Sequence, residues 1–266
     1  MNRSILIQPY QLLLKKRSLI FKIATPFLKL LSLFYRGNEL HCTCCESNFR
    51  KFLPFGATQR ENAICPGCLS LERHRLLWLY LKNKTNLFNE KLTVLHVAPE
   101  YIFKIKLILL TNLNYLTADI VPGEAMVQMD ITNIQYDDNY FDVILCNHVL
   151  EHIPNDDRAM KELHRVLKPN GWAILQVPLD PKLAKTIEGS PNLTLEEREK
   201  LFGHHDHVRQ YGRDYRDKLE QAGFTVKVDN YPQELGIEAI KKFALIADEG
   251  IFLCQKSPYL NFDLLP

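Results

Sequence analysis

The chain has 266 residues, of which 46% are apolar and 24% are charged, and its formal net charge is +2. These proportions are those of a globular protein, and they exclude a disordered or collagen-like chain. The charge is uneven, because residues 1–36 hold seven basic side chains and no acid, which leaves −5 for residues 37–266. A mildly acidic body argues against a nucleic-acid partner.

Residues 1–38 are expected to form a basic amphipathic helical segment. Lys15, Lys22, Lys29 and Arg36 recur every seven residues in an otherwise mostly apolar stretch, which on a helix gives a narrow polar stripe and a wide apolar face. Charges interrupt every apolar run before it reaches the length of a membrane span. Two interpretations stay open: a helix lying on an anionic membrane, or a helix packed on the domain or on a second copy. The expected location is the cytoplasm, with peripheral contact at the inner face of the membrane under the first interpretation.

Residues 39–82 are expected to form a small zinc-binding module followed by a helix. Two Cys-x-x-Cys pairs, Cys42 with Cys45 and Cys65 with Cys68, are separated by nineteen residues. Each pair can direct two thiolates to one ion, and four thiolates form the closed tetrahedral site that is typical of structural zinc.

Other polar residues surround these cysteines. Cys44 lies inside the first pair and could compete as a ligand, and His41 is a weaker alternative ligand. A helix is expected over residues 69–81. The Arg-His-Arg run at 73–75 either binds an anionic substrate group or lies in a solvated turn beside the zinc, and the second interpretation is slightly favoured.

A strand–helix–strand unit is predicted at the centre of the chain. Residues 143–146 are an apolar run of the length of a buried strand, an amphipathic helix follows to about residue 167, and residues 172–177 form a second buried strand. Asn147 and His148 directly follow the first strand. They therefore lie at the carboxyl edge of the sheet, where ligands bind in open α/β folds.

The residues of this unit resemble a known family. The stretch YFDVILCNHVLEHIPNDDRAMKELHRVLKPNGWAILQVP is similar to the central part of class I S-adenosylmethionine (SAM)-dependent methyltransferases of the small-molecule, type 11-like group. The cysteine pairs followed by CLSLERHR resemble a bacterial subgroup of these enzymes that carries a four-cysteine zinc knuckle. The resemblance implies that residues 83–266 form an α/β, Rossmann-like, doubly wound domain with a seven-stranded, mostly parallel sheet.

The resemblance also implies that SAM is the cofactor. In most enzymes of this family an acid ends the first strand and a Gly-x-Gly turn follows, but here His96 holds the position of the acid, and Ala98 and Glu100 hold those of the glycines. We interpret the loop as rewired, with Glu100 accepting hydrogen bonds from the SAM ammonium. The cofactor-binding residues predicted at the later strand ends are Asp119, Ile120, Asp130, Ile131 and Asn147.

Two of these acids have distinct predicted roles. Asp119 follows Glu100 by nineteen residues, close to the offset of the acid that binds ribose hydroxyls. The resemblance assigns Asp130 to the adenine amino group and Ile131 to the adenine ring. The alternative for each acid is a helix N-cap or a turn.

Residues 179–212 form a long connection that is expected to act as a lid over the substrate. Its densest part predicts His207 as a general base oriented by Asp206, with His148 as the other candidate base. The same groups could instead form a second metal site, an anion clamp that includes Arg209, or a hydrogen-bonded lid without chemistry.

The sequence as a whole predicts a SAM-dependent methyltransferase that contains structural zinc. The expected acceptor is a small molecule, a glycan or a lipid-linked intermediate, methylated on oxygen or nitrogen. One alternative is a catalytically inactive SAM-binding or zinc-dependent interaction protein. Another is an RNA methyltransferase, against which the acidic body argues.

Overall fold

The computed structural model describes residues 32–56 and 58–257. Lys15, Lys22 and Lys29 of the predicted amphipathic helix lie outside these residues. Arg36 begins strand β1 (Arg36–Cys42), so the prediction that it continues a helical stripe is wrong. Within residues 32–56 and 58–257, no helix is both long enough and apolar enough to cross a membrane.

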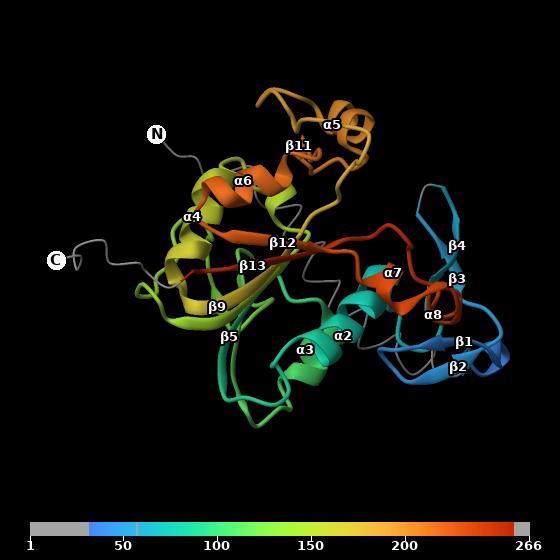
Figure 1. Ribbon diagram of the computed structural model, residues 1–266. Helices are drawn as coiled ribbons and strands as arrows, with labels where there is room; N and C mark the ends of the chain where they lie inside the picture. The colour runs from blue at the N-terminus through green and yellow to red at the C-terminus, as the bar shows by residue number, and fades with distance from the viewer. Residues whose placement is uncertain (1–31, 57, 258–266) are drawn as a thin grey trace.

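A seven-stranded sheet organises the described residues, in the order β12-β13-β9-β8-β5-β6-β7 (Figure 1). Neighbouring strands from β9 to β7 are parallel, and β13 is antiparallel to both β9 and β12. This confirms the predicted mostly parallel, Rossmann-like sheet. In that order the strands span Thr225–Asp229, Ile251–Gln255, Leu167–Gln176, Phe141–Asn147, Leu92–Val97, Leu113–Asp119 and Val127–Gln128.

The sheet separates two apolar cores, because successive side chains of a strand point to opposite faces. In β8, Ile144 and Cys146 pack into the core that helices α4 (Asp156–Val166) and α6 (Tyr215–Gln221) share. Val143 and Leu145 pack into the other core, whose helices are α2 (Glu72–Lys84), α3 (Tyr101–Leu107) and α7 (Tyr231–Leu235). Burial on both faces explains why this strand is continuously apolar in sequence.

The cysteine module consists of two short hairpins at one end of the molecule (Figure 1). Strand β1 pairs with β2 (Ser47–Phe49), and β3 (Leu53–Phe55) pairs with β4 (Arg60–Ile64). Helix α2 leaves the module and packs on the sheet, where its residues Leu76, Leu77 and Leu81 share a core with β5 and β8. The module and the sheet therefore have one continuous core.

Buried Arg75 ties α2, the cysteine module and helix α8 (Ile237–Phe243) together. Its side chain is 0% exposed and lies over the Phe52 ring at 4.6 Å. The solvated turn favoured from sequence for residues 73–75 is wrong, since these residues lie in the first turns of a helix. The guanidinium donates to five backbone carbonyls, those of Asn62, Ala63, Ser70, Phe243 and Ala244, at 2.7–3.2 Å.

Two local features shape the ends of short elements. Strand β7 ends at Gln128, and Asp130 then caps a tight turn, accepting hydrogen bonds from the backbone N–H and the hydroxyl of Thr132. Helices α7 and α8 follow one another directly in the chain. Gly236 separates them with a φ of +83°, which a residue without a side chain adopts readily.

The insertion after β9 has its own small framework. Strands β10 (Ile187–Glu188) and β11 (Arg209–Gln210) pair antiparallel, and α5 (Leu195–Phe202) lies between them. Thr194 and Glu197 form a reciprocal capping box at the start of α5, as expected for a short charged helix. The insertion therefore consists of ordered elements that pack beside the carboxyl edge of the sheet (Figure 1).

We expect Arg75→Met to lower the free energy of unfolding by about 3 kcal/mol, because five buried carbonyls would lose their charged donor. Urea unfolding followed by circular dichroism measures this change. Arg216→Met is the matched control, since the Arg216 side chain is 54% exposed and pairs only with Glu220. Equal decreases in the free energy of unfolding of the two variants would contradict the role of Arg75 in holding these segments together.

Candidate functional site

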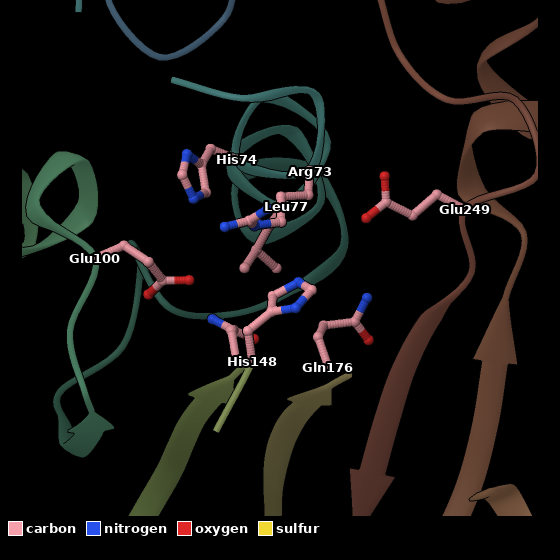
Figure 2. Close-up of a pocket in the computed structure, with 8 residues that line it drawn as sticks. Arg73, His74, Leu77, Glu100, His148, Gln176 and Glu249 are labelled. Atoms are coloured by element: carbon pink, nitrogen blue, oxygen red, sulfur yellow. The ribbon is translucent and has the colours of Figure 1, made fainter. Parts of the chain in front are cut away.

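A pocket of about 230 Å³, including its mouth, opens at the carboxyl edge of the sheet beneath α2 (Figure 2). Its walls come from helix α2, the ends of β8 and β9, the turn between β5 and α3, and the loop before β13. The lining residues are Arg73, His74, Leu77, Glu100, Asn147, His148, Gln176 and Glu249.

Several of these side chains present buried polar atoms to the pocket. The Asn147 amide, the Arg73 Nε, the His74 Nε2 and the Glu249 Oε2 have no hydrogen-bond partner within residues 32–56 and 58–257. An unpaired buried polar group costs about 1–3 kcal/mol, so a natural protein retains few of them without a use. Their convergence on one cavity fits a polar ligand with both donors and acceptors.

Glu100 is the acidic wall of the pocket and is held by a relay of two side chains. Fully buried His96 contacts the Glu100 carboxylate through Nε2 at 2.7 Å and the Tyr115 hydroxyl through Nδ1 at 2.8 Å. Burial by itself raises the pKa of Glu100. The hydrogen bond with His96 and the proximity of His96 and His74 outweigh burial and lower this pKa to about 2. The carboxylate is therefore ionised at neutral pH.

The predicted cofactor contact at His96 is therefore wrong, since both ring nitrogens face inward and orient Glu100 and Tyr115. Ala98, predicted at a glycine position, has a φ of +44° in the left-handed region. This conformation costs an alanine about 1 kcal/mol, and it gives the turn the shape that a glycine would give it. Ala98 shapes the loop without lining the pocket.

The acids at the next two strand ends have local partners. Asp119, at the end of β6, accepts from the Val121 N–H at 2.8 Å, and burial raises its pKa. Exposed Asp130 caps the turn at Thr132 described above. Neither lines the pocket, so both fit the turn role that the sequence left open as the alternative.

The two isoleucines predicted to contact adenine differ in exposure. Ile131 is only 3% exposed and packs in the core beside α4, so it has no face to offer a ring, and that prediction is wrong. Ile120 is 58% exposed directly after Asp119. An exposed apolar side chain next to a half-buried acid suits a nucleoside better than the Ile131 position does.

His148 is the predicted base that lies in the pocket. It has a φ of +54°, an uncommon conformation for a residue with a side chain, and it follows directly after β8. Its Nδ1 lies 3.5 Å from Glu151 Oε1, and its side chain is 26% exposed. The pocket lining includes His148 but not His207 or Asp206.

His207 and Asp206 lie instead in a separate histidine cluster formed with His152 and His204. The His207 ring centroid is 4.8 Å from that of His152 and 5.1 Å from that of His204. Asp206 contacts the Nδ1 atoms of His152 and His204. The predicted pairing of a histidine with Asp206 is thus present, but with His152 and His204 as the partners.

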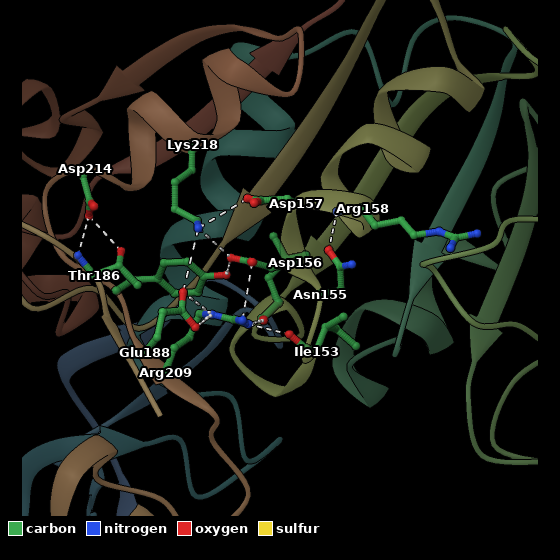
Figure 3. A network of polar contacts seen from close by, with 12 residues as sticks. Ile153, Asn155, Asp156, Asp157, Arg158, Thr186, Glu188, Arg209, Asp214 and Lys218 are labelled. Carbon is green, nitrogen blue, oxygen red and sulfur yellow. Dashed lines mark hydrogen bonds and ion pairs between the residues drawn. The ribbon is translucent and has the colours of Figure 1, made fainter. Parts of the chain in front are cut away.

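Arg209 is a structural residue, and the anion clamp considered for it is wrong (Figure 3). It is 2% exposed and donates to the carbonyls of Leu150, Ile153 and Pro154. It also pairs with Glu188 at 3.0 Å. Charge repetition in the loop suggested a ligand-binding arginine, yet these contacts leave it no atom for a ligand.

The four predicted zinc ligands converge in the small module. Cys42 Sγ lies 3.6 Å from Cys68 Sγ, and Cys45 Sγ lies 3.7 Å from Cys65 Sγ. All four sulfurs lie within 4.8 Å of one another. Sulfurs bound to one zinc at about 2.3 Å in a tetrahedron are about 3.8 Å apart, so the set fits the ion.

The two alternative ligands point elsewhere. Cys44 is buried and donates from Sγ to the His74 carbonyl at 3.4 Å. His41 pairs through Nδ1 with the Asn48 side chain at 2.8 Å. Neither belongs to the four-cysteine set, so the competition considered from sequence does not arise.

Sequence reasoning missed several pocket residues, among them Leu77, Gln176 and Glu249. Gln176 joins β9 to the β13 segment, donating to the Gly250 carbonyl and accepting from the Phe252 N–H. Arg73 and His74 were noted only as an anion-binding option. Gln176 could have been predicted, because it is the last residue of its strand, as Asn147 is, and ligands bind at the carboxyl ends of the strands.

Comparisons with known proteins find similarity to methyltransferases. Residues 110–175 match the family model of a methyltransferase domain. A 2-phytyl-1,4-naphtoquinone methyltransferase of Nostoc punctiforme is 37% identical over 65 residues, which are 23% of this chain and 28% of that protein. A sterol 4-C-methyltransferase of Caenorhabditis elegans is 33% identical over 88 residues, which are 33% of this chain and 25% of that protein.

The chain thus covers about a quarter of the length of these curated relatives. Among solved structures, the cyclase SpnF superposes with a TM-score of 0.51 at 15% identity, covering 90% of this chain and 95% of that chain. This likeness concerns the fold alone. Residues 110–175 are thus similar to a methyltransferase domain, and the observed strand order is that of a Rossmann-like sheet.

Proposed function

We propose that this chain is a SAM-dependent methyltransferase that acts on a small-molecule acceptor. The observation that carries the proposal is the pocket at the carboxyl edge of the sheet, where ionised Glu100 and the unpaired amide of Asn147 face one cavity within a methyltransferase domain. The names of the curated relatives describe quinone and sterol methylation, which supports a small-molecule acceptor. A glycan or lipid-linked acceptor, and the choice of oxygen or nitrogen, stay predictions.

The polar atoms of the pocket suit the amino-acid end of SAM. Glu100 is the acceptor for the ammonium group. Burial lowers the pKa of His74 to about 3, so its ring is neutral at pH 7. Its Nδ1 accepts from the Leu71 N–H at 3.1 Å, which leaves the proton on Nε2. His74 Nε2 and Arg73 Nε are therefore both donors, and together they can bind the carboxylate of SAM.

The remaining parts of SAM would extend along the same edge of the sheet. Asp119 ends the neighbouring strand β6, where a carboxylate can accept from two ribose hydroxyls. Exposed Ile120 would pack on the adenine ring. Asn147, at the end of β8, lies between the cofactor end and the acceptor end of the pocket, and its amide can both donate and accept.

When bound, SAM supplies an electrophilic methyl group. The chain must then align the acceptor and remove a proton, and alignment alone can lower a barrier by several kcal/mol. His148 is the proposed base, because it lines the pocket and the Glu151 carboxylate lies 3.5 Å from its Nδ1. A carboxylate at this position orients the ring and stabilises its protonated form.

We also propose that the four cysteines bind a structural zinc ion that supports the roof of the pocket. The loop between Cys42 and Cys45 contacts the start of α2. Thr43 donates to the Arg75 carbonyl at 2.8 Å, and Cys44 donates to that of His74. Because His74 lines the pocket, an ordered metal loop would fix one wall of the cofactor site.

The first test is SAM binding by calorimetry. We expect Glu100→Gln and Asn147→Ala to weaken binding at least about 10-fold, because each removes a buried partner whose loss costs about 1–3 kcal/mol. Glu196→Gln on the exposed side of α5 is the control and should bind like the wild type. Wild-type affinity in both pocket variants, or no binding by the wild type, would refute the proposed cofactor site.

The pH dependence of the Glu100 effect is a second test. A pKa of about 2 keeps Glu100 ionised throughout the neutral range. The affinity ratio between wild type and Glu100→Gln should therefore be the same at pH 5.5 and pH 8.0. A ratio that collapses towards 1 at pH 5.5 would mean that the carboxylate titrates there, contrary to the relay through His96.

The third test concerns zinc. Cys65→Ser should lose the ion and unfold more easily, because structural zinc contributes directly to folding. Cys44→Ser is the matched control, since this thiol is buried in the same loop but lies outside the four-sulfur set. Elemental analysis and thermal unfolding measure both effects. Equal zinc content in the two variants would argue against the assigned ligands.

A further inference from the structure

The histidine cluster is formed where the insertion folds back onto the turn after β8. The 3-10 helix η2 (Leu150–His152) supplies Glu151 and His152, and the loop after α5 supplies His204, Asp206 and His207. The Val208 N–H donates to the Glu151 carbonyl at 2.9 Å. The contacts of Arg209 shown in Figure 3 fix the next residue of the loop, so the two segments are held in register.

Two sets of three side chains in this cluster have metal-ligand spacing. Glu151, His152 and His207 form one set, and His204, Asp206 and His207 form the other. Within each set the ligand atoms lie within 4.8 Å of one another. Two ligands on one ion at about 2.1 Å lie roughly 3–4 Å apart, so side-chain rotations of about 1 Å complete either set.

The rings of His152 and His207 are oriented as metal-bound histidines usually are. His207 Nδ1 lies 3.2 Å from the Phe202 carbonyl, and His152 Nδ1 lies 3.3 Å from the Asp206 carbonyl. A carbonyl only accepts, so each Nδ1 carries the proton and each Nε2 keeps its lone pair. Metal-ligating histidines typically donate their other N–H to a backbone carbonyl in this way.

Glu151 provides an independent indication of a cation. Its side chain is 1% exposed, and its Oε2 has no hydrogen-bond partner among the described residues. A buried carboxylate oxygen without a partner is costly, and a positive ion next to it removes that cost. One ring nitrogen of His152 and one of His207 lie within 4.8 Å of a Glu151 carboxylate oxygen, so an ion bound there would contact all three side chains.

We propose that Glu151, His152 and His207, with His204 and Asp206 as outer ligands, bind one divalent first-row transition-metal ion. Two imidazoles with one carboxylate are typical of zinc, iron or cobalt, whereas magnesium and calcium prefer oxygen ligands alone. The site differs from the cysteine site in its ligands and in its position. It does not depend on methyl transfer, so it stands or falls independently of the proposed function.

The site borders the proposed acceptor side of the pocket. Glu151 Oε1 lies 3.5 Å from Nδ1 of His148, which lines the pocket, and the same carboxylate belongs to the set formed with His152 and His207. One carboxylate thus joins the candidate base to the proposed ion. Metal binding would hold the insertion against η2 and so close the wall of the pocket on that side.

Cobalt(II) is the probe, because its spectrum distinguishes the two sites. Four thiolates give cobalt an intense near-ultraviolet charge-transfer band, and imidazole with carboxylate gives only weak visible bands. The experiment titrates Co²⁺ into the full-length protein as purified, with zinc retained in the cysteine site, and follows the weak visible bands and the metal content. The wild type should bind one further equivalent without gaining thiolate bands.

Three variants decide between a metal site and a hydrogen-bonded lid. His207→Ala should weaken Co²⁺ binding at least about 100-fold, because even the partners behind a ligand are worth about 10–100-fold. His205→Ala is the matched control, since His205 only stacks on His204 and belongs to neither set. Glu151→Gln preserves the shape of the side chain and provides the answer if His207→Ala does not fold.

The outcomes are distinct. Loss of the extra equivalent in His207→Ala or Glu151→Gln, with retention in His205→Ala, supports the site. Equal binding by the wild type and all folded variants, or no extra equivalent in the wild type, overturns it. SAM affinity is measured on the same samples, so failure of this site is distinguishable from failure of the cofactor pocket.

Discussion

The buried guanidinium of Arg75 is the constraint on which the pocket depends. Its five carbonyl partners come from the cysteine module and from the end of α8, segments about 170 residues apart in sequence. The hydrogen bonds of the guanidinium described above all go to backbone carbonyls, so these dipoles must stay in place to solvate the charge. Because Arg73 and His74 precede it on α2, the position of Arg75 sets how two pocket donors face the sheet. The cysteine module and the pocket edge of the sheet are therefore mechanically coupled.

The elements that sequence reasoning placed correctly are those with strong local patterns. The run at 143–146 is apolar because β8 is buried on both faces, and Asn147 ends it at the ligand-binding edge. Glu100 was predicted from its place in the turn after the first strand, and it does line the pocket. The two Cys-x-x-Cys pairs likewise identified the four sulfurs that lie together, because this spacing is itself a strong local pattern.

Two of the failures concern side chains with a partner that lies far away in sequence. His96 was expected to contact the cofactor, but Tyr115 on the adjacent strand occupies its other nitrogen. Arg209 looked like an anion-binding residue in a charged loop, although the turn after β8 supplies its carbonyl partners. Such pairings depend on tertiary register, and no periodicity in the sequence encodes them. The role of Arg75 also could not be read from its local sequence, because some of its carbonyl partners lie about 170 residues away. Its neighbours Arg73 and His74 are the residues of this run that line the pocket.

Glu151 shows how the separate features combine into a site. It follows β8 within a turn, so the sheet positions it as firmly as it positions Asn147 and His148. One oxygen lies 3.5 Å from His148 Nδ1, and the same carboxylate is grouped with His152 and with His207 of the insertion. A movement of the histidine cluster would therefore change the position of the Glu151 carboxylate and, with it, the orientation of His148. Most of the cluster lies on the insertion, whereas His148 follows a strand of the sheet. Glu151 therefore connects the insertion to the proposed base, and proton removal needs a correctly oriented imidazole.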